Sequence, residues 1–226
     1  DRCRIGELVD ISSRPHTSEQ ITRNPELLSQ VEVVFSGWGA PKLDEEFLAL
    51  APNLKIVFYG AGSICRFATE AMWQRGIRVT TAAEVNAVPV AEYVLSQILF
   101  GLKLGWQLAL GIRATKQWPS RETDATIRQV PGAYRSTVGL VSLGAISTKV
   151  IELLKPFDLN VLLYSKGLTA AQEARLGIES VVLEELFQRA DIVSLHQPAT
   201  PEHLGTITGE LVAQMKRGAT LINSAR

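Results

Sequence analysis

The chain has 226 residues, of which 46% are hydrophobic and 20% are charged, as in an ordinary globular protein with one large or two medium domains. Lysine plus arginine and aspartate plus glutamate each number 23, so no net charge would draw the chain to nucleic acid or to an anionic membrane. Two cysteines, Cys3 and Cys65, are too few for a disulfide framework or a zinc site. This composition favours a reducing, cytoplasmic compartment and predicts no metal centre.

Short strands and helices alternate over the first third of the chain. The apolar runs predict strands at Ile5–Asp10, Val31–Ser36, Lys55–Tyr59 and Ile77–Thr80, with helices beginning at Thr17 or Ser18 and covering Leu43–Ala51 and Ile64–Arg75. The first strand has almost nothing before it, and the last residues follow a strand directly. Because domain boundaries normally fall in polar linkers, we expect a piece of a longer protein.

A long helix is predicted over about residues 89–114. The apolar stretch Val88–Ile112 is long enough to suggest a membrane span, but it contains Glu92, Gln97, Lys103 and Gln107. A long amphipathic or largely buried helix explains this pattern better than a span. The polar, turn-rich segment Gln117–Pro131 predicts a loop.

The stretch Thr137–Tyr164 reads as one strand–helix–strand unit. An apolar run at Thr137–Leu143 predicts a buried parallel strand, a helical pattern follows, and Val161–Tyr164 predicts a second strand. The turn between them would rest at a helix N-terminus, where free N–H groups and the helix dipole favour anions. The dinucleotide fingerprint G-x-G-x-x-G is written here as Ser142-Leu-Gly144-Ala-Ile-Ser147, so by itself the motif is weak.

Further alternation completes a second series of elements. Strands are predicted at Ser180–Leu183, Ile192–Leu195 and Thr220–Asn223, with helices at Ala170–Leu176, Glu184–Arg189 and Gly209–Met215. The fold class is therefore α/β, with two Rossmann-like or flavodoxin-like domains that contain parallel sheets. We place the domains at residues 1–83 and 84–226, with the long linking helix at the start of the second.

Several of these stretches together resemble the D-isomer-specific 2-hydroxyacid dehydrogenases. The matching segments are LKIVFYGAGSI at 54–64, VPVAEYVLSQIL at 88–99, TVGLVSLGAI at 137–146, ADIVSLHQPATPEHLGTIT at 190–208 and MKRGATLINSAR at 215–226. The resemblance implies a substrate domain at 1–83, an NAD(P)-binding Rossmann domain at 84–226 and an active-site cleft between them. It also implies reversible hydride transfer between NAD(P)H and the C2 carbonyl of a small 2-oxo acid.

The resemblance assigns the substrate contacts to two places. Arg226 matches the family's catalytic arginine, whose planar guanidinium can hold a carboxylate or polarise a carbonyl. Gly60, Ala61 and Gly62 resemble the loop whose backbone N–H groups receive the substrate carboxylate. The plain alternatives are a surface arginine after a strand and a tight turn after a strand.

The cofactor positions follow from the same resemblance. Gly144, Ala145 and Ile146 would present N–H groups to the pyrophosphate, while the serines at 142 and 147 replace glycines and imply altered affinity. Ser165 stands where NAD-binding members place an aspartate, and Lys166 follows it. The absence of that carboxylate favours NADP(H) over NAD(H), although Lys166 also reads as a solvated turn residue.

The nicotinamide side would be lined by residues near two strand ends. The resemblance places His196 and Pro198 in the nicotinamide-ribose segment and Ser224 and Ala225 at the nicotinamide face, although a lone histidine at a strand end is more often structural. The family's acid–base histidine does not match His16, His196 or His203 and is expected beyond Arg226. We therefore expect the chain alone to lack full activity.

Three functions stay open at this stage: a dehydrogenase, a dinucleotide-sensing binding protein of the same fold, and a non-binding relic. The degraded glycine turn is what motivates the second. The resemblance further implies a homodimer formed through the long helix, with the core helix between domains as the alternative. The identity of the 2-hydroxy acid is not determined by these residues.

Overall fold

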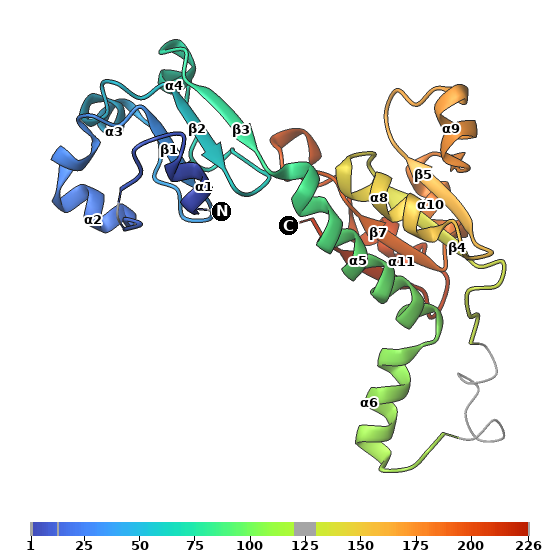
Figure 1. The fold of residues 1–226 in the computed structure, drawn as a ribbon. Helices are drawn as coiled ribbons and strands as arrows, with labels where there is room; N and C mark the ends of the chain where they lie inside the picture. The colour runs from blue at the N-terminus through green and yellow to red at the C-terminus, as the bar shows by residue number, and fades with distance from the viewer. Residues whose placement is uncertain (1, 13, 120–129, 226) are drawn as a thin grey trace. The chain divides into compact units, whose positions relative to one another are not determined.

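The computed structural model describes residues 2–12, 14–119 and 130–225 (Figure 1). The chain divides into two compact units, Asp1–Ala83 and Glu84–Arg226, which are described separately below as unit 1 and unit 2. Most of the loop predicted over Gln117–Pro131 lies outside the described residues, as does Arg226.

Unit 1 is built on a three-stranded parallel sheet of order β1-β2-β3. The strands are β1 (Val33–Ser36), β2 (Ile56–Tyr59) and β3 (Arg78–Thr81), and the helices are α1 (Arg2–Gly6), α2 (Ser18–Arg23), the 3-10 helix η1 (Pro25–Leu28), α3 (Glu45–Leu50) and α4 (Glu70–Gln74). Because side chains alternate between the faces of a strand, Val57 and Tyr59 of β2 point into one core with Phe47 and Met72.

The other face of this sheet is partly open. Val33 pairs with Ile56 and Phe35 with Phe58 in the parallel register, so four apolar side chains share that face. Phe35 and Phe58 stay 45% and 38% exposed and stack with their ring centroids 5.0 Å apart. The parallel register itself brings these two rings together.

Two predictions in unit 1 are wrong, and local capping explains one of them. The strand expected at Ile5–Asp10 is absent, because α1 occupies Arg2–Gly6 and turns follow it. The helix expected over Ile64–Arg75 begins only at Glu70, because the Thr69 hydroxyl accepts a hydrogen bond from the Met72 N–H and caps the helix there.

Unit 2 contains a five-stranded parallel sheet of order β6-β5-β4-β7-β8. The strands are β4 (Thr137–Val141), β5 (Asn160–Tyr164), β6 (Glu179–Ser180), β7 (Ile192–Leu195) and β8 (Thr220–Asn223). Counted along the unit this order is 3-2-1-4-5, which is that of a doubly wound dinucleotide-binding sheet. The predicted parallel α/β fold is confirmed.

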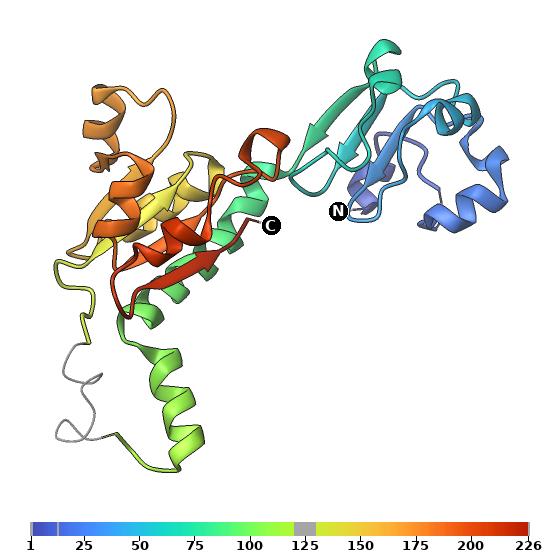
Figure 2. The ribbon, with the colours of Figure 1, turned by 180° about the vertical axis from the view of Figure 1, so that it is seen from behind.

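Helices cover both faces of the second sheet. The helices of unit 2 are α5 (Ala83–Leu102), α6 (Gly105–Thr115), α8 (Ala145–Leu154), α9 (Ala170–Leu176), α10 (Leu183–Arg189), the 3-10 helix η2 (Pro201–His203) and α11 (Gly209–Ala213). Helices α5 and α8 share one core with Leu140 and Ile192, while α10 and α11 share another with Leu162 and Val193. Figure 1 shows the first layer, and Figure 2 shows the second from behind.

Helix α5 is, in the part of the chain that the structure describes, the one helix long and apolar enough to cross a membrane by length and composition. Its residues Ala91, Val94, Ile98 and Leu102 are buried in the core formed with the sheet and α8. A core helix meets the same criteria, so this packing accounts for its apolar composition.

The single long helix predicted over about 89–114 is instead two helices joined by a sharp bend. Leu104 adopts a left-handed backbone with φ +53°, and α6 begins at Gly105. A Cβ at residue 105 would lie 2.4 Å from the Phe100 ring, so a larger residue there would require that ring to move. Phe100 and Trp106 then meet edge to face at 5.3 Å, and α6 leads away from the sheet with no buried residue (Figures 1 and 2).

Candidate functional site

The candidate cofactor site lies where the strand order of unit 2 reverses. Strand β4 has β5 on one side and β7 on the other, and the connections from these strands run to opposite faces of the sheet. In such sheets ligands bind outside the carboxyl ends of the strands at this reversal. The residues that follow β4 and β7 therefore set the chemistry of the site.

The turn after β4 is held in a left-handed conformation at Ser142. This residue has φ +78°, which a side chain disfavours and glycine accepts freely. The Ser142 N–H donates to the Tyr164 carbonyl at 2.7 Å, which ties the turn to the end of β5. Serine thus occupies the first glycine position of the fingerprint without changing the backbone that the turn requires.

Gly144 leaves open space at the beginning of α8. Its φ of −152° is accessible to any residue, and a Cβ there would meet nothing within 4 Å. The fold itself therefore gives no steric reason for glycine, whereas the close approach of an anion to the helix N-terminus does. The residues present fit a pyrophosphate at this turn.

The third fingerprint position, Ser147, has a structural role. Its buried hydroxyl accepts a hydrogen bond from the Gly144 N–H at 2.8 Å and donates to the Gly144 carbonyl at 3.2 Å. One N–H of the turn is thereby satisfied within the protein. The N–H groups of Ala145 and Ile146, in the first turn of α8, are the kind that a helix leaves without an internal partner.

The end of β5 also meets this turn. The Leu143 N–H donates to the Ser165 hydroxyl oxygen at 3.4 Å, so position 165 lies next to the fingerprint turn. Lys166 is exposed, and no ion pair involves it among the described residues.

His196 is held at the carboxyl end of β7. The backbone N–H of His196 donates to the Val141 carbonyl at 3.0 Å. In its side chain, Nδ1 lies 3.0 Å from the Ser224 hydroxyl. That hydroxyl also lies 3.1 Å from the Leu195 carbonyl; when its one hydrogen is donated there, Nδ1–H is the donor to Ser224 and Nε2 is left as an acceptor. Nε2 is buried without a partner among the described residues.

Burial also determines the charge of His196. Desolvation lowers the pKa of this imidazole from 6.5 to about 4, so the ring is neutral near pH 7. Hydrogen bonds also hold the segments that follow β7 and β8. The Gln197 side-chain amide donates to the Thr206 hydroxyl at 2.9 Å, and the Ala225 backbone N–H donates to Asn223 Oδ1 at 3.0 Å. Pro198 lies within the loop so braced.

Unit 1 carries the glycine loop predicted to receive a carboxylate. The Gly60 N–H already donates to the Ser36 carbonyl at 2.8 Å, which joins the ends of β1 and β2. Among the described residues the N–H groups of Ala61 and Gly62 have no such partner. The loop thus offers two free backbone donors where three were expected.

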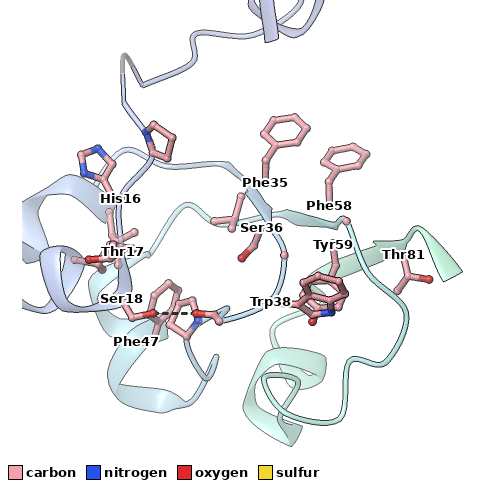
Figure 3. Close-up of a pocket in the computed structure, with 18 of the residues that line it drawn as sticks. His16, Thr17, Ser18, Phe35, Ser36, Trp38, Phe47, Phe58, Tyr59 and Thr81 are labelled. Carbon is pink, nitrogen blue, oxygen red and sulfur yellow. Dashed lines mark hydrogen bonds between the residues drawn. The ribbon is translucent and has the colours of Figure 1, made fainter. Parts of the chain in front are cut away.

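A cavity of about 1030 Å³ opens at the same edge of this sheet (Figure 3). The carboxyl ends of all three strands contribute Ser36, Tyr59, Gly60 and Thr81 to its lining. Its other walls include His16, which was weighed above only as an acid–base candidate, and four aromatic residues that the sequence did not single out, namely Phe35, Trp38, Phe47 and Phe58. The available signal was an aromatic residue inside the turn SGWGAPK that follows the second apolar run.

The structure thus groups the predicted residues in part. Ser142, Gly144 and Ser165 converge on one turn of unit 2, and His196 contacts Ser224 at the neighbouring strand ends. Gly60, Ala61 and Gly62 belong to unit 1, and Arg226 is outside the described residues. Across residues 2–12, 14–119 and 130–225, no group of three metal-ligating side chains occurs.

The depressed pKa of His196 predicts a dependence of stability on pH. Between about pH 4 and 6.5 the unfolded state binds more protons than the folded state, so the free energy of unfolding rises with pH across this window. The full effect is about 3 kcal/mol. Urea unfolding of His196→Asn, which keeps a nitrogen for Ser224, should lack this component, while the exposed His16→Asn should keep it. An unchanged pH profile in His196→Asn would contradict the assignment.

Known proteins resemble this chain over most of its length. Residues 107–226 match the family described as D-isomer specific 2-hydroxyacid dehydrogenase, NAD binding domain. A D-3-phosphoglycerate dehydrogenase of Mycobacterium tuberculosis is 34% identical over 196 residues, covering 83% of this chain and 34% of that protein. The corresponding protein of Bacillus subtilis is 27% identical over 187 residues, again covering 83% of this chain and 34% of that protein. The chain spans about a third of the length of these curated relatives.

Solved structures show the same fold. The TT0316 protein from Thermus thermophilus superposes with a TM-score of 0.75 at 25% identity, covering 100% of this chain and 69% of that one. A D-isomer specific 2-hydroxyacid dehydrogenase from Lactobacillus delbrueckii, in its NAD-complexed form, gives a TM-score of 0.75 at 20% identity, covering 95% and 63%. The predicted family is confirmed: the chain belongs to the D-isomer specific 2-hydroxyacid dehydrogenases, and its residues 107–226 match their NAD-binding domain.

Proposed function

We propose that unit 2 binds a nicotinamide dinucleotide and that the whole protein transfers a hydride between NAD(P)H and the C2 carbonyl of a small 2-oxo acid. The observation that carries this proposal is the open space at Gly144, at the N-terminus of α8 and at the strand reversal. The cofactor supplies the hydride when bound. The chain's own residues provide position, charge and exclusion of water.

Each predicted residue has a role in this proposal. The N–H groups of Ala145 and Ile146, with the bare Cα of Gly144, receive the pyrophosphate. His196, Pro198, Ser224 and Ala225 border the nicotinamide side, where neutral His196 offers Nε2 as an acceptor.

The substrate contacts come from two further places. The free N–H groups of Ala61 and Gly62 in unit 1 receive the substrate carboxylate, and Gly60 holds the loop on Ser36. Arg226 polarises the carbonyl, a role assigned by resemblance alone.

By the resemblance, none of His16, His196 and His203 holds the position of the family's acid–base histidine. His196 Nδ1 lies 3.0 Å from the Ser224 hydroxyl and His203 Nδ1 lies 2.7 Å from the Thr200 hydroxyl, so both rings are engaged within unit 2. We therefore propose that residues 1–226 bind cofactor without full turnover. The alternative is a dinucleotide-sensing protein of the same fold, which is motivated by the replacement of two fingerprint glycines by Ser142 and Ser147.

Turnover separates these two functions. The whole protein should oxidise NADH or NADPH in the presence of glyoxylate, hydroxypyruvate, pyruvate or phenylpyruvate. If the protein binds cofactor but turns over none of these acids, the dinucleotide-sensing function is favoured. If titration does not change NAD(P)H fluorescence, only the non-binding relic agrees with the result.

We also propose a cytoplasmic homodimer in which α5 and α6 form the contact. Helix α6 has no buried residue, and Tyr93, Phe100, Trp106 and Leu110 are 58%, 41%, 56% and 60% exposed on the two helices. A two-fold contact would bury such a surface. The free thiols of Cys3 and Cys65 suit a reducing compartment, which cell fractionation would test.

The cofactor site is tested by filling its open space. Gly144→Val should raise the dissociation constants of NADH and NADPH at least about tenfold, because the side chain occupies the pyrophosphate position. Folding should lose only about 1 kcal/mol, because valine is a poorer N-cap. Gly111→Val is the matched control, since a Cβ there also meets nothing within 4 Å. Equal affinity for cofactor in Gly144→Val and the parent chain would refute the site.

The cofactor preference is tested at the end of β5. Ser165→Asp should weaken NADPH binding and strengthen NADH binding, each by about tenfold, because a carboxylate repels the 2′-phosphate and accepts hydrogen bonds from the ribose. Lys166→Ala should weaken NADPH alone, and Lys155→Ala, on the far end of α8, should change neither. A parent chain that prefers NADH would overturn the proposed preference.

The dimer is tested by placing a charge on α6. Leu110→Asp should convert a dimer into a monomer in light scattering, because an unpaired carboxylate would be buried at the contact. Leu204→Asp alters an equally prominent leucine, 76% exposed, outside α5 and α6 and should stay dimeric. A monomeric parent protein at tens of micromolar would exclude this arrangement.

A further inference from the structure

The Ser224 hydroxyl takes the place of a backbone donor where the hydrogen-bond ladder between β7 and β8 ends. The Thr220 N–H donates to the Asp191 carbonyl at 3.1 Å, and the parallel register repeats this bond at every second residue. The same pattern pairs the Ser224 N–H with the Leu195 carbonyl, but among the described residues that bond is not formed. The Ser224 side-chain hydroxyl donates to this carbonyl instead, at 3.1 Å.

A turn at Asn223 accounts for this exchange. The Asn223 side-chain oxygen accepts a hydrogen bond from the Ala225 N–H at 3.0 Å, which is the turn that asparagine forms with the backbone two residues on. The chain therefore leaves the ladder after Asn223, where β8 ends. Because Leu195 is buried and a buried carbonyl without a donor is costly, the one hydrogen of the Ser224 hydroxyl is needed there.

The strand register also places this hydroxyl beside His196. Ser194 and Ile222 are partners in the register, and the residues two positions further on, His196 and Ser224, lie on the same face of the sheet. His196 Nδ1 is 3.0 Å from the Ser224 hydroxyl, whose own hydrogen is used at Leu195, so Nδ1 must supply the hydrogen of this second bond. Since burial lowers the pKa of His196 and keeps the ring neutral near pH 7, Nε2 then carries no hydrogen.

Resting on the proposed function, we infer that Ser224 is a positioning residue that fixes His196 in the tautomer with its hydrogen on Nδ1. Nε2 thereby becomes a hydrogen-bond acceptor for the nicotinamide half of the dinucleotide. Nε2 is buried without a partner among the described residues. The ribose hydroxyls and the carboxamide of the nicotinamide half are donors, whereas the pyrophosphate oxygens only accept. His196 follows β7, on the other side of β4 from β5, at whose end the adenosine half is expected.

Nitrogen NMR of the protein with isotope-labelled histidine tests this inference, because the shift of each ring nitrogen reports whether it carries a hydrogen. The His196 signals, identified by their loss in His196→Asn, should show a hydrogen on Nδ1 and none on Nε2. Whichever of NADH and NADPH binds more tightly should shift the Nε2 signal, and AMP, which lacks the nicotinamide half, should not. Ser224→Ala should move the hydrogen toward Nε2 and raise the dissociation constant of the cofactor about fivefold.

Two further variants serve as controls. Ser224→Thr keeps a hydroxyl at the same position and should restore the hydrogen on Nδ1. Ser96→Ala removes an exposed hydroxyl of α5 that likewise donates to a backbone carbonyl, that of Tyr93 at 2.6 Å. It should change neither the tautomer of His196 nor the affinity for cofactor.

The outcomes keep the inference and the proposed function apart. A hydrogen on Nε2 in the parent protein would overturn the inference, and so would an unchanged tautomer in Ser224→Ala, because Ser224 would then be structural only. If the cofactor changes its fluorescence on binding but leaves the Nε2 signal unmoved, or if AMP moves it equally, cofactor binding stands and the inference fails. If no cofactor binds while Ser224→Ala still changes the tautomer, the control of His196 by Ser224 stands and the proposed function fails.

Discussion

The cofactor site of unit 2 depends on one backbone constraint, the left-handed turn at Ser142. The hydrogen bond from Ser142 N–H to the Tyr164 carbonyl holds the end of β4 against the end of β5, and α8 can then begin at Ala145 with its N-terminus facing the strand reversal. A left-handed serine costs of order 1 kcal/mol relative to glycine. Packing of the buried strands maintains it, because β4 is almost completely enclosed between the two helical layers.

At the other end of the same strands, near their first residues, the interactions hold the sheet together. Asp191 accepts a hydrogen bond from the Thr137 N–H at 2.8 Å, and its other oxygen accepts one from Lys216 at 2.8 Å. One carboxylate thus joins the beginnings of β4 and β7 to the segment before β8. Nearby, Gly139 has room for no side chain, because a Cβ would lie 2.5 Å from Leu186 of α10. Structural requirements gather at one end of the strands and ligand-facing positions at the other.

The sequence predicted those features that depend on residues close together in the chain. Strands β7 and β8 begin and end where predicted, because short apolar runs between turn residues admit few alternatives. The bend at Leu104 was missed, because neither its left-handed backbone nor the packing of the Phe100 ring over Gly105 is encoded in helical periodicity. The fingerprint turn was recognisable from residue order. The cavity of unit 1 was not, because Phe35 and Phe58 become neighbours only after separate strands pair.

The attachment of α6 has a consequence for local unfolding. A free helix of eleven residues is marginal in water, and among the described residues α6 is held to its unit by the buried Leu104 before it, the contact between Phe100 and Trp106, and a hydrogen bond from Trp106 to Gln97. Its opening free energy must therefore be far smaller than that of the sheet. In a monomer we therefore expect amide hydrogens of α6 to exchange with solvent before those of β4, and a protease to cut α6 before the five-stranded core unfolds. Whatever surface covers α6 acts as its stabilising ligand, and its protection from exchange reports how much of that surface is occupied.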